Sequence, residues 1–161
     1  MTRTPLLFLL AIALAAPAAA QNAGQIAKAR AGASCPGCNL FQADFANVQL
    51  KGRNFARARL RQADLSASVM NRTSFAGADL RDVNAYGGVF GGASFAHADL
   101  THATFVGAYL QGADFSGARL DGTNFSGAEM AHARGLTRRQ LGVACGDAST
   151  TLPSGLRLPY C

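Results

Sequence analysis

The stretch ADLTHATFVGAYLQGADFSGARLDG, residues 98–122, divides into five blocks of five residues with Leu or Phe third in each block. This register runs without interruption from residue 38 to residue 132 and gives nineteen blocks. We call the third residue of each block its centre. Eight centres are Leu, eight are Phe, two are Met, and the exception is Ala85. A period of five fits neither an α-helix nor a β-strand, so it predicts a solenoid in which each block forms one side of a coil.

The identity of the centres indicates how many sides a coil has. Every fourth centre is the same residue on two tracks of the repeat, which predicts a four-sided coil with like residues stacked. Nineteen blocks then form nearly five coils. Ala85, beside the glycine-rich residues 86–92, leaves either a void in the core or a local lapse without consequence. The two tracks are Leu40, Leu60, Leu80, Leu100 and Leu120, and Phe55, Phe75, Phe95 and Phe115.

The pattern A-[D/N]-[L/F]-x-x over residues 38–132 resembles that of the pentapeptide-repeat family. The resemblance implies an all-β solenoid, a right-handed quadrilateral β-helix in which the centre and the residue two before it point inward. Large Leu or Phe and small Ala would then alternate in a narrow tube. Such an interior is a packed core with no room for a substrate.

The residues outside the repeat are predicted to be a signal peptide and two short helical caps. Residues 1–20 combine Arg3, a short apolar run and an Ala-x-Ala signal, which is typical of a secretory signal peptide; a retained anchor is the alternative. No later stretch is apolar enough to span a bilayer, so an integral membrane protein is not expected. We divide the rest into an N-terminal cap (21–37), with Ile26 over the first coil, the β-helix (38–132) and a C-terminal cap (133–161). In that second cap, Thr137 and Gln140 form a capping-box pattern, and Leu136 and Leu141 would cover the last coil.

Four cysteines lie outside the regular part of the chain: Cys35, Cys38, Cys145 and Cys161. Export implies an oxidising compartment, which favours paired cysteines. Nearly five coils separate the two ends by on the order of 20 Å, whereas bonded cysteines have Cα atoms within about 7 Å. We therefore predict the pairs Cys35–Cys38 and Cys145–Cys161. A redox-active C-x-x-C is the alternative, although such a motif normally opens a helix in a βαβ unit.

Basic residues gather at the N-terminal end of the repeat and form what we call the basic belt: Lys51, Arg53, Arg57, Arg59 and Arg61. In the coil, they would cover about three sides, and Arg53, at an inward position, would turn out toward the open end. Such a belt attracts polyanions such as nucleic acid, anionic lipid or envelope polysaccharide. No outward aromatic side chains interleave with it for base stacking, so nucleic acid is not expected. The alternative is a soluble face without a partner.

The outward positions offer little catalytic chemistry. Asp79 and Asp99 would stack between Arg59 and Arg119 in a self-compensating charge ladder rather than act as an acid–base pair. The three histidines, His97, His102 and His132, do not suggest a shared metal. We expect no enzyme, no cofactor, no metal and no small-molecule substrate.

The function predicted is therefore a non-enzymatic, exported binding or scaffolding module in the cell envelope, periplasmic or extracellular. Its partner would be an unknown protein or an envelope polyanion, and it would be a monomer or a weak dimer. The alternatives are thiol–disulfide exchange through Cys35 and Cys38, and polyanion binding through the basic belt. Some members of the family that this sequence resembles mimic DNA with a strongly acidic surface. This repeat carries eight basic and eight acidic residues, so its surface is not strongly acidic. We do not carry that activity over.

Overall fold

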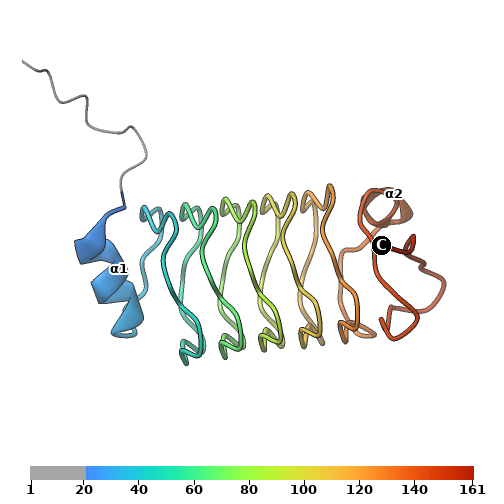
Figure 1. Ribbon diagram of the computed structural model, residues 1–161, viewed down its shortest axis with the longest axis horizontal. Coiled ribbons are helices and arrows are strands. Elements are labelled where there is room, and N and C mark those ends of the chain that lie inside the picture. The colour runs from blue at the N-terminus through green and yellow to red at the C-terminus, as the bar shows by residue number, and fades with distance from the viewer. Residues whose placement is uncertain (1–20) are drawn as a thin grey trace, which may run out of the picture.

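The computed structural model describes residues 21–161 as one continuous stack of coils between two short helices (Figure 1). Helix α1 (Ala23–Arg30) lies at one end of the stack, and helix α2 (Arg138–Leu141) lies at the other. The predicted signal peptide, residues 1–20, falls outside the described residues. Among residues 21–161, no helix is long and apolar enough to cross a bilayer.

The coils repeat every twenty residues, as the sequence predicts. Parallel bridges join each residue that precedes a centre to the equivalent residue twenty positions later, for example Asp79 to Asp99 and Asp99 to Arg119. The sides hold isolated bridges instead of extended strands, because each side is only five residues long and a corner takes two of them. The architecture is thus a four-sided β-helix built from single-residue ladders.

Each corner requires one residue in the left-handed conformation. The second residue after every centre from position 42 to position 127 has φ between 51° and 70°. The turn is closed by a backbone hydrogen bond, as from Ala103 N–H to the Leu100 carbonyl at 2.9 Å, which is the pattern of a type II turn. Half of these corner residues are glycine, and the other half, including Ala67, are not.

The interior is filled by the centres and by the small residues two before them. All nineteen centres are buried, and the Phe column stacks with ring centroids 5.9, 5.3 and 5.2 Å apart from Phe55 through Phe75 and Phe95 to Phe115. The three buried hydroxyl groups each donate a hydrogen bond to a backbone carbonyl. Thr73 Oγ1, for example, donates to the Leu50 carbonyl at 2.7 Å. The buried polar side chains of the otherwise apolar core are therefore all hydrogen-bonded within residues 21–161.

Ala85 is fully buried, and the ring of Phe90, the next centre, makes edge contacts with Phe75, Phe95 and Phe105. A Cβ added at Gly88 would overlap that ring. The absence of a side chain at Gly88 therefore leaves room for the ring of Phe90.

Both helices are fixed to the stack by side chains. The Asn22 carboxamide accepts from Gln25 N–H at the start of α1, and Gln25 Oε1 accepts from Asn39 N–H at 2.7 Å. Ile26 packs on the core and Ala29 is fully buried. At the other end, Thr137 and Gln140 form a capping box and Leu141 is fully buried.

A pair of substitutions at the same corner of different coils tests the left-handed requirement. Gly107→Ala should lower the free energy of unfolding by about 1 kcal/mol, because Ala disfavours φ near 65° although no atom lies within 4 Å of its Cβ. Ala67→Gly, two coils earlier, should raise it by less than about 1 kcal/mol, since the relieved strain is partly offset by chain entropy. Urea unfolding measures both. Equal effects of the same sign would contradict the assignment of these corners.

Candidate binding surface

Because the interior is full, chemistry is confined to the outward positions and the two ends. Every centre from Leu40 to Met130 is at most 2 % exposed. Three pockets lie on the outer surface, with volumes of about 380, 350 and 320 Å³. A binding function must therefore use the outer surface.

The basic belt lies on the outside of the stack. Its five residues are all exposed, including Arg53, whose side chain lies beside Gly32, directly after α1, instead of entering the core. Arg61 pairs with Asp82 at 3.3 Å between Nε and Oδ2. Within residues 21–161, the other four belt side chains form no ion pair, so most of the positive charge faces solvent.

The structure adds a member to this surface that sequence reasoning missed. Arg72 follows the belt by one coil, and together with Lys51, Gly52 and Asn71 it lines a pocket of about 350 Å³. A second pocket of about 320 Å³ lies at Arg57, beside Pro36 and Gly37. Arg72 could have been assigned to this surface from the 20-residue register, because that register stacks Arg72 on the corner at Gly52. Two hollows with cationic walls thus flank the belt.

The charge ladder exists, but its partners differ from those expected. Asp79 and Asp99 do bridge, yet the cation between them is Arg81, whose Nη2 lies 2.7 Å from Asp79 Oδ2 and whose Nε lies 3.9 Å from Asp99 Oδ2. Arg119 contacts Asp99 at 3.5 Å, as predicted, while Arg59 makes no ion pair within residues 21–161. The two-pronged contact with Arg81 holds the pKa of Asp79 below its ordinary value, against a smaller opposing effect of burial.

Most acidic side chains before the centres have a structural task. The carboxylate or carboxamide oxygen accepts the backbone N–H two residues on, as from Ala46 to Asp44 at 2.9 Å and from Ser66 to Asp64 at 2.9 Å. This Asx turn satisfies a corner N–H that has no neighbour in the ladder. Asp114 accepts hydrogen bonds from the Ser116 hydroxyl and from the Ser116 backbone N–H, and these bonds lower the pKa of Asp114. The Asp and Asn residues before the centres thus have a structural role at the corners.

The four cysteines lie in two pairs at disulfide distance. The Cα atoms of Cys35 and Cys38 are 5.5 Å apart, and those of Cys145 and Cys161 are 4.9 Å apart. Cys35 is 5 % exposed, and Pro36 and Gly37 form the turn that begins the first coil. Their oxidation in the cell stays a prediction.

The histidines do not come together. The rings of His97 and His102 lie over the corners at Gly117 and Gly122 respectively, while His132 pairs through Nδ1 with Gln111 at 2.9 Å. Within the described part of the chain, no three His, Cys, Asp or Glu side chains are grouped so that they could hold a metal ion.

The pKa of Asp79 gives the charge ladder a testable pH dependence. A carboxyl whose pKa is lowered by folding stabilises the fold above its unfolded pKa of 3.8, and this contribution is lost as the pH falls through the lower folded value. Arg81→Gln should therefore cost about 0.5–1 kcal/mol at pH 7, since the pair is partly exposed, and should cost less at about pH 3, where the contribution is already declining. Urea unfolding at both pH values checks this. A loss that is independent of pH, or an equal loss in the unpaired control Arg72→Gln, would contradict it.

A sequence model of pentapeptide repeats matches residues 54–84 and 89–127 in eight copies. No curated protein matches the chain significantly.

Among solved structures, the chain is similar to three pentapeptide repeat proteins. The first is HetL, involved in heterocyst differentiation regulation in the cyanobacterium Nostoc sp. strain PCC 7120, with 25% identity over 71% of this chain and a TM-score of 0.41. This chain spans about half of HetL, 51% of its length. A protein of the Arabidopsis thaliana thylakoid lumen shares 29% identity over 65% of this chain and 59% of its own, with a TM-score of 0.31. A further Nostoc protein, alr5209, shares 20% identity over 82% of this chain and 95% of its own, with a TM-score of 0.38.

The unbroken five-residue register, the four-sided stack and the eight matched copies lead to one conclusion: the chain carries the repeats of the pentapeptide-repeat family over residues 54–84 and 89–127 and forms the right-handed quadrilateral β-helix that these repeats imply.

Proposed function

We propose that this protein is a non-enzymatic, exported binding module that holds an anionic partner of the cell envelope on its basic belt. The observation that carries the proposal is the cluster of exposed cations without ion pairs on a rigid stack. Lys51, Arg53, Arg57 and Arg59 all belong to it within residues 21–161. Desolvated phosphate, sulfate or carboxylate groups would replace the water around these side chains.

The rigidity of the scaffold supports binding over catalysis. The belt side chains project from one coil whose neighbours are locked by ladder hydrogen bonds of about 2.7–3.0 Å, such as Phe55 N–H to the Ser74 carbonyl and Arg57 N–H to the Ala76 carbonyl. A fixed array of cations loses little entropy on binding a regular polyanion. The small hollows at Lys51 and Arg57 would accept single anionic groups instead of enclosing a substrate.

The ends of the molecule support function outside the cytoplasm. We infer that α1 with residues 21–37, and α2 with residues 133–161, cap the nearly five coils of residues 38–132. They would shield the terminal core and the backbone edges from solvent and from other chains. Two cysteine pairs, one in each cap, suit an oxidising compartment. Thiol–disulfide exchange is not part of the proposal, because Cys35 is buried and its motif opens a coil turn instead of a helix.

Two triple variants of equal charge test the proposal. Lys51→Gln, Arg57→Gln and Arg59→Gln together should weaken binding to heparin, or to vesicles rich in anionic lipid, by at least about tenfold, at roughly 1 kcal/mol per cation near a charged surface. The control combines Arg134→Gln, Arg138→Gln and Arg157→Gln, which are exposed but far along the chain from the belt. Binding is measured as a function of salt, and its affinity should fall as salt rises.

Heparin and lipid vesicles are separate arms, so they distinguish a polysaccharide from a membrane as the source of the anionic groups. Equal weakening by both triple variants would show attraction to net charge only and would contradict the proposal. So would salt-independent binding, or no binding by the unaltered protein at low salt.

A further inference from the structure

One of the four ladders stops before the others at the C-terminal end. Three ladders continue past the repeat into the following chain, through the bridges Asp114 to Arg134, Asn124 to Cys145 and Glu129 to Thr151. The fourth ladder, which carries the Leu centres, has its last bridge between Asp99 and Arg119. The chain forms α2 at the level where the next bridge residue of this side would lie (Figure 1).

A further bridge residue, one coil after Arg119, would make two backbone hydrogen bonds with the last coil. The structure replaces only one of these two bonds. One coil earlier, Arg119 N–H donates to the Ala98 carbonyl at 2.9 Å, and the Arg119 carbonyl accepts from Leu100 N–H at 2.9 Å. At the open edge, Gln140 Nε2 donates to the Ala118 carbonyl at 3.0 Å and so takes the place of the donor. Its Oε1 is used by Thr137, so the acceptor has no substitute.

Leu120 N–H is therefore the exception in the ladder. Every other centre from Leu40 to Met130 donates its N–H to a backbone carbonyl of the next level. Within residues 21–161, nothing accepts from Leu120 N–H, although the side chain of Leu120 is only 1 % exposed. An unpaired backbone donor at a sheet edge is a template for pairing with another chain.

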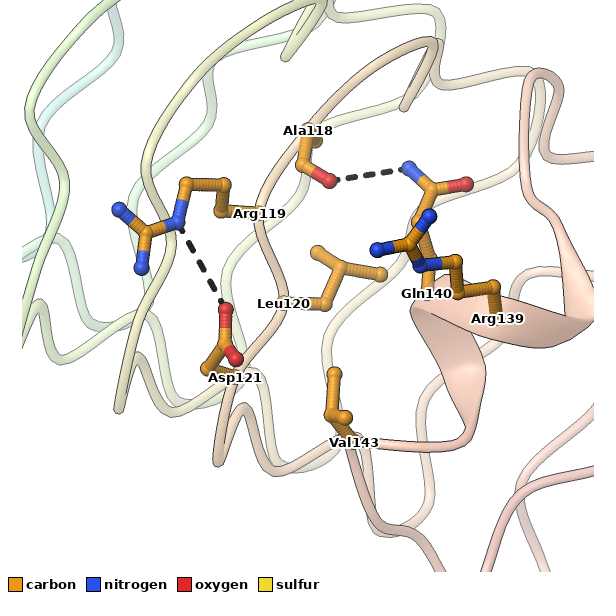
Figure 2. Close-up of a pocket in the computed structure, with 7 residues that line it drawn as sticks. All are labelled: Ala118, Arg119, Leu120, Asp121, Arg139, Gln140 and Val143. Carbon is orange, nitrogen blue, oxygen red and sulfur yellow. Dashed lines mark hydrogen bonds and ion pairs between the residues drawn. The ribbon is translucent and has the colours of Figure 1, made fainter.

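A pocket of about 380 Å³ lies at this edge, and we call it the edge pocket. The last coil forms one wall, and α2 with Val143, which follows it, forms the other (Figure 2). The lining residues are Ala118, Arg119, Leu120, Asp121, Arg139, Gln140 and Val143.

The charges of the edge pocket favour an acidic ligand. Arg119 is already engaged by Asp99 and Asp121, at 3.5 and 3.7 Å. Arg139 forms no ion pair in the described part of the chain and is exposed. Val143, at the lower wall in Figure 2, is 52 % exposed, which is high for an apolar residue of a pocket. The site thus offers a backbone donor, a free guanidinium and an apolar contact.

We propose that the edge pocket binds an extended acidic segment of a partner protein by completing the interrupted ladder. A backbone carbonyl of the segment accepts from Leu120 N–H, an acidic side chain next to it pairs with Arg139, and an apolar side chain contacts Val143. This is β-strand addition reduced to one bridge residue, with the charge pair supplying selectivity. The site lies about three coils, on the order of 15 Å, from the basic belt, so it goes beyond the function proposed for the belt.

The test uses an acetylated and amidated five-residue peptide of alternating glutamate and valine, titrated into the isotopically labelled protein. The Leu120 amide signal should shift in a saturable manner and exchange more slowly with solvent. A peptide with glutamine in place of glutamate should bind at least about fivefold more weakly. Arg139→Gln should weaken the glutamate peptide by a similar factor. Arg138→Gln, the neighbour in α2 that does not line the pocket, is the matched control and should change binding by less than twofold.

The belt triple variant separates this site from the belt, because it should leave the Leu120 shift unchanged. The proposal is overturned if the peptide shifts only belt residues, or if Leu120 does not respond. It is also overturned if Arg138→Gln and Arg139→Gln weaken binding equally, which would indicate attraction to the charge of α2 alone.

Discussion

Everything in this structure depends on the left-handed residue at each corner. Because the second residue after a centre takes φ between 51° and 70°, the chain turns after one paired residue and presents its next centre inward five positions later. Four such corners return the chain above its starting point, twenty residues on, where the ladder hydrogen bonds form. The stacked Phe and Leu columns follow from that return and stabilise it in turn.

The same constraint decides where function can reside. Two of every five side chains fill the tube, and the residue before the centre is often used by an Asx turn. Acidic residues are thereby committed to the corners, or, as Asp79 is, to an arginine partner. Lys51, Arg57 and Arg59 have no such partner and face solvent unpaired within residues 21–161. The ends of the stack are the other region where backbone groups are not consumed by the ladder.

The sequence predicts the repeat well because periodicity alone determines it. The register, the 20-residue columns and the capping box of Thr137 and Gln140 all rest on local patterns, and the structure contains each of them. Details that depend on rotamers or on the path after the repeat were not predictable. Arg81, not Arg59, reaches Asp79, because a side chain one residue past the centre can fold back over its own side. The basic belt could be placed from the sequence, whereas the edge pocket could not, since it arises where α2 interrupts one ladder and the other three continue.

Residue-resolved hydrogen exchange of the free protein tests the central claim, that the ladder hydrogen bonds hold the stack and are missing, within residues 21–161, at the single centre Leu120. The account predicts slow exchange at the centre amides of the Leu column from Leu40 to Leu100, and exchange at least about a hundredfold faster at Leu120, which lacks an acceptor. Protection of Leu120 equal to that of Leu100 would contradict it, as would protection that does not recur every five residues.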